Sequence, residues 1–310
     1  MLAVAGLLVV TTTALAVGGV WPFRESARKP AGAAVSTPAA TAARFDVRRA
    51  MATARLQVDA GPRPAGSKAL KRVGDRLKAM LPESRFEPVP GHPGLRNIVG
   101  SVAGSGPVLV IASHYDTLKY PRGSLGANNA AAGVGAVIEL ARIAKAMRRP
   151  VTAQGIRFVL FDGEQSTSPR EADFYATALR GSRAYVRAHA EEVQAMILLD
   201  YVANKNIRLP REGTSDADLW AQVRAAAKTV GVARVFPDAV GESILDDSTP
   251  FQQAQIPTAN FIDWNDPHRH KLSDTFDKLS PTSLDAVGET VAQLIVDRDA
   301  DAAQTQQLTP

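Results

Sequence analysis

Short, continuously apolar runs alternate along the chain with longer segments of helical spacing. The runs are rich in Val, Ile, Leu and Phe, which is typical of strands buried on both faces of a sheet. The pattern predicts strands at residues 85–90, 96–102, 107–113, 155–162, 195–200 and 258–263, and helices at 45–57, 67–80, 134–147, 181–186, 216–230 and 282–295. Because strands alternate with helices, we expect a three-layer α/β/α sandwich with a mixed, mostly parallel central sheet.

Five polar positions stand where these strands end or in the loops beside them. His114, Gln165 and Asp200 each follow or close an apolar run, and Asn129 and His270 lie in loops. Polar side chains at the carboxyl ends of adjacent strands converge on one crevice in open α/β sheets. Two histidines and an aspartate there suggest a metal site, whereas two neutral amides are unusual beside them.

The two ends of the chain differ from its middle. Residues 1–22 are mostly apolar, with no charge in the first 20, and we expect a signal peptide or a membrane anchor. Residues 23–43 are rich in Ala, Pro and Thr and predict a disordered linker. Residues 44–300 form a single domain in this interpretation, followed by a disordered tail at 301–310. We expect an extracytoplasmic location, although the basic residues just after the apolar segment favour a cytoplasmic C-terminus.

The composition narrows the classes of function. The chain is 45% hydrophobic and 22% charged, which is ordinary for a globular protein. Its net charge of +5 comes without a long basic run or an aromatic platform, so we expect no nucleic-acid partner, and membrane contact only through the N-terminal segment. The absence of Cys excludes disulfides and thiolate chemistry. Ser113, Ser166 and Ser182 lack the context of a nucleophile elbow, which disfavours a serine hydrolase.

Five segments resemble, in order, the M28 zinc exopeptidases, a family that also includes the animal glutaminyl cyclases. They are His114-Tyr-Asp116, Gly126-Ala-Asn128-Asn129, Phe161-Asp-Gly-Glu164-Gln165, Leu199-Asp200 and His270-Lys-Leu-Ser-Asp274-Thr. The Gly61–Ser67 segment resembles the N-terminal part of the family, and Leu179–Tyr185 resembles its helix after the glutamates. The resemblance spans roughly residues 45–297 and implies the fold of these exopeptidases.

The resemblance also implies a zinc site. A typical member holds two zinc ions, each bound by one histidine and one carboxylate, with a bridging Asp between them and a Glu as general base. On this pattern His114, Asp200 and His270 are the expected metal ligands. Glu164 is the expected general base, and Asp116 is expected to orient His114.

Two ligand positions depart from the family. Asn129 stands at the bridging Asp and Gln165 at the second Glu, so two negative charges are missing from a site for zinc. Glutaminyl cyclases hold one zinc with the bridging Asp, the second Glu and the last His, and of these three only His270 is kept. The family implies one or two zinc ions, but the ligand set is depleted. His268 is either a substitute ligand or an exposed loop residue.

A further segment resembles cyclase-like members. Asp246-Asp247-Ser-Thr-Pro-Phe251 matches a stretch whose second Asp helps to hold the N-terminus of the substrate. Asp247 is therefore a candidate for binding an α-ammonium group, or alternatively it caps a short helix. Trp264 either lines the substrate pocket or packs in the core.

The resemblance implies one function, with two alternatives. The first is aminopeptidase-type hydrolysis of N-terminal peptide bonds, with a peptide or protein N-terminus as the partner. The second is a non-catalytic domain that binds a peptide or protein outside the cytoplasm. The third is an acyltransferase similar to the glutaminyl cyclases.

Overall fold

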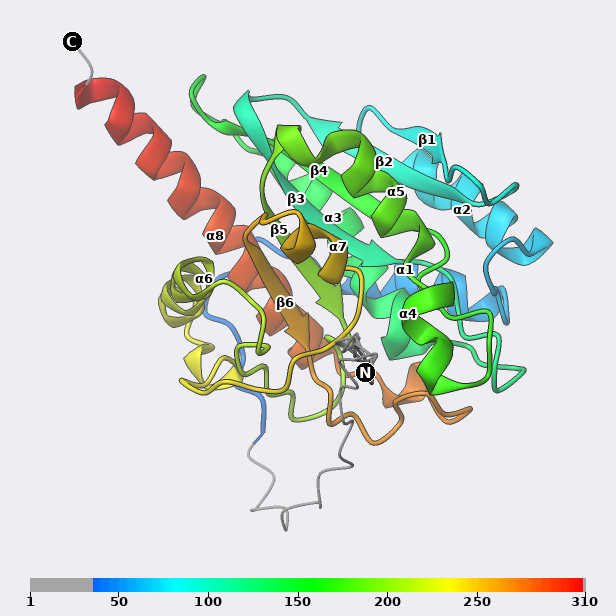
Figure 1. The fold of residues 1–310 in the computed structure, drawn as a ribbon. Coiled ribbons are helices and arrows are strands. Elements are labelled where there is room, and N and C mark those ends of the chain that lie inside the picture. Colours follow the sequence, from blue (N-terminus) through cyan, green and yellow to red (C-terminus); the bar gives the residue numbers. More distant parts are fainter. Residues whose placement is uncertain (1–35, 309–310) are drawn as a thin grey trace, which may run out of the picture. The chain divides into compact units, whose positions relative to one another are not determined.

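Six strands form one sheet in the computed structural model, which describes residues 36–308 (Figure 1). The order across the sheet is β1-β2-β4-β3-β5-β6, with the strands at Arg85–Pro88 (β1), Arg96–Val102 (β2), Ser105–His114 (β3), Gln154–Phe161 (β4), Val193–Asp200 (β5) and Thr258–Ile262 (β6). Strands β4, β3, β5 and β6 are parallel, and β1 and β2 add an antiparallel edge. The expected mixed, mostly parallel sheet is confirmed.

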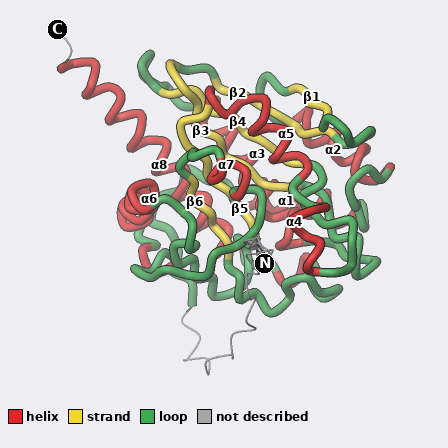
Figure 2. The backbone as a smooth tube through the Cα atoms, viewed as in Figure 1, coloured by secondary structure: helices red, strands yellow, loops and turns green. Residues whose placement is uncertain are grey.

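Helices cover both faces of this sheet (Figure 2). One face carries α5 (Arg180–His189) and α7 (Thr249–Gln253), and the other carries α1 (Val47–Asp59), α2 (Lys68–Met80), α3 (Gly133–Ala146), α6 (Ala217–Thr229) and α8 (Pro281–Leu308). Alternating side chains of β3 show the division, because Leu109 and Ile111 pack with α1 and α3, whereas Val110 and Ala112 pack with Tyr185 of α5. The three layers predicted from the sequence are therefore present.

Local sequence signals decide where several helices begin. The Asp46 carboxylate accepts backbone N–H bonds from the first turn of α1, at 3.0 and 3.2 Å. Ser67 caps α2 at 3.1 Å, as predicted, and Asp216 caps α6 at 2.8 Å. Such caps satisfy N–H groups that have no partner within the helix.

The entry to α3 differs from the sequence-based expectation, which placed Asn129 in a loop before a helix that starts at residue 134. Residues Ala127–Ala132 form a π-helical turn that continues directly into α3. Gly126 begins the turn with a left-handed backbone (φ 55°). The Asp274 carboxylate then accepts the N–H groups of Asn128 and Asn129, at 2.8 and 3.1 Å. A distant acid, which local patterning does not register, therefore orders this segment.

Both boundaries of the domain also differ from expectation. Helix α8 continues to Leu308, so the expected disordered tail is helical over residues 301–308. At the other end, part of the expected linker lies against the domain, since Thr37 hydrogen bonds Ser283 and Thr41 hydrogen bonds Val230. The predicted N-terminal signal peptide or anchor lies outside the described residues. Within residues 36–308, no helix combines the length and apolar character needed to cross a bilayer.

The short α4 (Phe174–Thr177) completes the described elements, in the connection between β4 and α5. This connection leaves β4 at the same edge of the sheet where β3 and β5 end. It therefore borders the crevice in which the polar positions were expected to meet.

Candidate functional site

The carboxyl ends of three adjacent parallel strands bring the expected site residues together. His114 is the last residue of β3, Asp200 is the last residue of β5, and Glu164 and Gln165 follow β4. His114 Nε2 lies 3.8 Å from Asp200 Oδ1, and His114 Nδ1 lies 4.0 Å from Glu164 Oε2. The π-helical turn adds Asn129 to the same buried cluster. The structure thus brings these strand-end residues close together.

Asp116 fixes the position of two parts of this cluster. Its two carboxylate oxygens accept the backbone N–H groups of Glu164 and Gln165, each at 3.1 Å. One of them also lies 3.5 Å from His114 Nδ1, and the ring nitrogen is 3.1 Å from the backbone oxygen of Asp116. Asp116 therefore sets the orientation of the His114 ring and of the loop that carries Glu164.

The facing atoms of His114 and Asp200 have no hydrogen-bond partner, although both side chains are buried. Buried polar atoms are nearly always partnered, so a group that binds between Nε2 and Oδ1 would satisfy both. Burial opposes a charged ring, but the carboxylates of Glu164, Asp116 and Asp200 raise the pKa of His114 well above its ordinary value. The pair can thus hold a shared proton or one cation.

The two amides form a hydrogen-bonded chain instead of a cation site. Gln165 Nε2 donates to Asn129 Oδ1 at 2.9 Å, and Asn129 Nδ2 donates to the Tyr201 hydroxyl at 2.5 Å. All three side chains are buried. The oxygen of Asn129 that would replace the bridging carboxylate is therefore occupied by an N–H group. Tyr201 was missed from the sequence, where its only signal is that it directly follows Asp200.

His270 lies at the border of the site. The residue is exposed, and its ring packs beside two aromatic rings. The ring has edge-to-face contacts with Tyr201 and Trp264, at centroid distances of 6.4 Å each. Desolvation, followed by the charges of Arg269 and His114, lowers the pKa of His270 to about 4. Trp264 both packs against Tyr201 and faces this ring, so its two expected roles are not exclusive.

His268 does not point to the buried cluster as a substitute ligand. Its Nδ1 lies 3.0 Å from the Ser273 hydroxyl, within the same loop. Its backbone N–H bonds to Asp266 at 2.8 Å. These contacts support the alternative of a loop residue with a local role.

Asp247 is placed in the site and does not cap α7. The neighbouring Asp246 takes the local role, because its side chain accepts from the backbone N–H and hydroxyl of Ser248 at 2.9 and 2.6 Å. Asp247 is fully buried, and neither of its carboxylate oxygens has a hydrogen-bond partner. Burial raises the pKa of Asp247 to about 7, and the charge of His114 and the nearby Ser182 hydroxyl oppose the shift. The expectation that this acid faces the substrate is consistent with its position.

The site contains more acids than cations. Asp116, Glu164, Asp200 and Asp247 surround one imidazole, and burial followed by the neighbouring carboxylates raises the pKa of Glu164 well above its usual range. Within residues 36–308, no lysine or arginine side chain hydrogen bonds to Glu164, Asp200 or Asp247. Buried carboxyl groups in such surroundings either hold protons or bind a cation.

The residues present do not fit a two-zinc centre or the single zinc of a cyclase. In the described part of the chain, no three His, Asp or Glu side chains converge in a geometry that could hold a metal ion. Among the described residues, His114 Nε2 and Asp200 Oδ1 face each other without a hydrogen-bond partner, and Glu164 Oε2 beside His114 is also unpartnered. Asn129 and Gln165 use their amides on each other, and a neutral amide supplies no charge to balance zinc.

Two residues that sequence reasoning did not select hold the site in place. Arg63 is fully buried and donates to the backbone oxygens of Gln57, Leu125 and Gly126, at 2.7 to 3.2 Å. Asp274 organises the turn that carries Asn129. Both residues lie in segments that resemble the M28 family, and this resemblance was the sequence signal that could have identified them.

Comparisons with known proteins agree with this architecture. The sequence model of Peptidase family M28 matches residues 97–295. A leucine aminopeptidase precursor from Bacteroides thetaiotaomicron is 27% identical, with a TM-score of 0.73 over 83% of this chain and 98% of that chain. Glutaminyl cyclase from Porphyromonas gingivalis is 26% identical, with a TM-score of 0.74 over 83% and 99% of the two chains.

A Zn-dependent exopeptidase from Parabacteroides distasonis is 25% identical, with a TM-score of 0.68 over 81% of this chain and 98% of that chain. No curated protein sequence matches significantly. The family match covers more than half of the chain. The chain therefore belongs to peptidase family M28.

Proposed function

We propose that this protein binds the free N-terminus of a peptide or protein in the M28 crevice and lacks the two-zinc hydrolytic centre. The main observation behind this proposal is the buried carboxylate of Asp247, whose two oxygens have no hydrogen-bond partner. An α-ammonium group has three N–H donors and a positive charge, and it would satisfy such a carboxylate. Glu164 and Asp200 each supply a further unpartnered acceptor in the same buried cluster.

The amide pair supports binding over hydrolysis. The hydrogen bond from Gln165 to Asn129 fills the place that two carboxylates would need in order to hold a second ion. Without an ion, no group in the crevice lowers the pKa of an attacking water, and Glu164 loses its partner as a general base. An extracytoplasmic location, with residues 1–22 as signal peptide or anchor, is part of this proposal.

A second candidate is aminopeptidase-type hydrolysis with a single zinc ion. It is favoured by the unpartnered His114 Nε2 and Asp200 Oδ1, which face each other at 3.8 Å. The similarity to an aminopeptidase precursor and to glutaminyl cyclases keeps hydrolysis and cyclisation within the range of activities to assay. Cyclase chemistry has less support, since only His270 survives from the three zinc ligands of that group.

Calorimetric titration with matched peptides tests the proposal. We expect a peptide with a free N-terminus to bind at least tenfold more tightly than its N-acetylated form, a difference of about 1.4 kcal/mol. Asp247→Asn should abolish this preference. Asp246→Asn is the matched control, because it makes the same replacement at the neighbouring buried acid. The Asp246 side chain bonds Ser248 and Asn260, so this variant should lower stability and keep the preference.

The same samples separate the candidates when they are measured with EDTA and with zinc. N-terminal recognition that is unchanged by EDTA, together with no release of amino acids and no cyclisation of N-terminal Gln peptides, supports the binding role. Stoichiometric zinc with chelator-sensitive peptidase activity would establish the second candidate and refute the first.

A further inference from the structure

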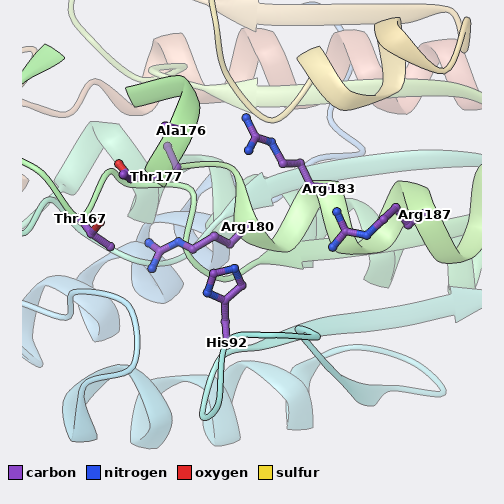
Figure 3. A pocket seen from close by; sticks show the side chains of 8 residues that line it. His92, Thr167, Ala176, Thr177, Arg180, Arg183 and Arg187 are labelled. Atoms are coloured by element: carbon purple, nitrogen blue, oxygen red, sulfur yellow. The ribbon is translucent and has the colours of Figure 1, made fainter. Parts of the chain in front are cut away.

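A cavity of about 400 Å³ on the α5 side of the sheet lies outside the acidic cluster. Three arginines of α5, Arg180, Arg183 and Arg187, line it together with His92 from the loop after β1 (Figure 3). Two threonines and two alanines complete the lining, so no acidic side chain contributes to it. Its size falls in the range of small-molecule sites, roughly 300–1,000 Å³.

The three arginines form a row on one face of their helix. They are spaced by three and then four residues, which places side chains next to each other along a helix. Like charges at this spacing repel. Arg142 and Arg149 are neutralised by Glu139 and Asp299, whereas none of the three arginines of this row forms an ion pair within residues 36–308.

Two of the arginines are held in place by the backbone. Arg180 donates to the carbonyl oxygens of Gly163 at 3.1 Å and Gln165 at 2.6 Å. Arg183 donates to the carbonyl of Tyr175 and lies over its ring, 4.5 Å from the centroid. A guanidinium has five N–H donors, so both keep donors for a ligand in positions that are already fixed.

Arg187 is different because it has no hydrogen bond or ion pair among the described residues. Its exposed side chain extends over the cavity from the next turn of α5, as Figure 3 shows. A free guanidinium beside two fixed ones can close on a ligand from the solvent side. The lining therefore carries three guanidinium groups and no acid, with Arg183 extending away from Arg187 and His92 in this view.

We propose that this cavity binds a small oxyanion with two or more negative charges, of the phosphate or polycarboxylate class. Arginine suits such groups because its planar fork bonds two oxygens at once. The effect of the arginines on His92 agrees with this assignment: desolvation, followed by the charges of Arg180 and Arg187, lowers the pKa of His92. A bound anion would reverse the electrostatic part of that shift.

The cavity is also connected to the site loop. Arg180 bonds the backbone of the residues on both sides of Glu164, so an anion that recruits Arg180 would act on the loop of the acidic cluster. For the same reason Arg180 is unsuitable for the test, since its loss would disturb that loop directly. Arg187 is suitable for the test, because it makes no bond to that loop.

The experiment is calorimetric titration of the full chain with inorganic phosphate and with citrate, using chloride at the same ionic strength as the blank. We expect one saturable site for at least one of the two anions, and about tenfold weaker binding in Arg187→Gln. Arg148→Gln is the matched control, because Arg148 is also exposed but follows α3 on the opposite face of the sheet. The anion that binds more tightly identifies the class.

A second readout follows His92 by NMR, with His92→Gln for its assignment. We expect the pKa of His92 to rise when the anion is bound, and this change to be absent in Arg187→Gln. The proposal is overturned if neither anion saturates a site, if Arg187→Gln binds as well as the wild type, or if Arg148→Gln weakens binding equally. None of these outcomes depends on N-terminal peptide binding, so the two proposals fail separately.

Discussion

Replacing the amides of Asn129 and Gln165 by carboxylates should turn their hydrogen bond into a repulsive contact. A bound zinc ion should relieve this repulsion. In Asn129→Asp with Gln165→Glu, two charged groups replace atoms that lie 2.9 Å apart. At about 3 Å and an effective dielectric constant of ~20, their repulsion is about 5 kcal/mol, so the protein should hold a proton on one of them. Because that pKa is raised in the folded state, the double variant should lose stability as pH rises.

The assay is a double-mutant cycle of thermal unfolding, measured in EDTA and in zinc. In Asn129→Asp the Gln165 amide can still donate to the new carboxylate. In Gln165→Glu the Asn129 amide can do the same if it turns over and accepts from the Tyr201 hydroxyl. Each single variant should therefore lose much less stability than the double variant. The repulsion corresponds to a fall in Tm on the order of 10 °C in EDTA. Zinc at a hundred times its Kd should raise the free energy of unfolding of the double variant by about 2.7 kcal/mol, with the two new carboxylates and His270 as ligands. The single variants should not be stabilised in this way.

The wild type supplies the decisive comparison. Its Tm should change little with zinc, because its amides already satisfy each other. A wild type that zinc stabilises as much as the double variant would refute the reasoning, and so would a coupling energy near zero in EDTA. The first result would mean that His114, Asp200 and His270 bind zinc without the carboxylates.

Two further predictions concern residues around the site. Arg63→Met removes the side-chain donor of the Gln57 and Leu125 carbonyl groups, whereas the Gly126 carbonyl still accepts the Ala131 N–H. It should lower the free energy of unfolding by about 2 to 4 kcal/mol in urea titrations. Arg48→Met changes a side chain that is 91% exposed and should have little effect. Burial, and then the charge of Asp116, raises the pKa of Asp162 from 3.8 to about 7. Because the pKa of Asp162 is raised in the folded state, its proton stabilises the fold below pH 4, and this stabilisation is lost as the pH rises to 7. Asp162→Asn should therefore flatten the dependence of the free energy of unfolding on pH between 4 and 7. A variant profile parallel to the wild type would contradict this assignment.

The fold was largely readable from the sequence because its signals are local. Apolar runs located all six strands of the described sheet, and Ser67 marked the start of α2. The wrong predictions arose where a distant residue decides the conformation. Asp274 orders the turn at Asn128, 146 positions away, and no periodicity within residues 126–135 could report that bond.

The sequence by itself determined which chemical groups stand at the strand ends, including the two amides at positions 129 and 165. Only the tertiary structure decided what those groups do to one another. It joined Gln165 to Asn129 across 36 positions, turned Asp247 into the crevice while Asp246 took the local bonds, and set three arginines of α5 around a cavity without an acid. Hydrophobic spacing encodes which face of an element is buried, whereas the partner of a buried polar atom depends on distances between segments that are separate in sequence.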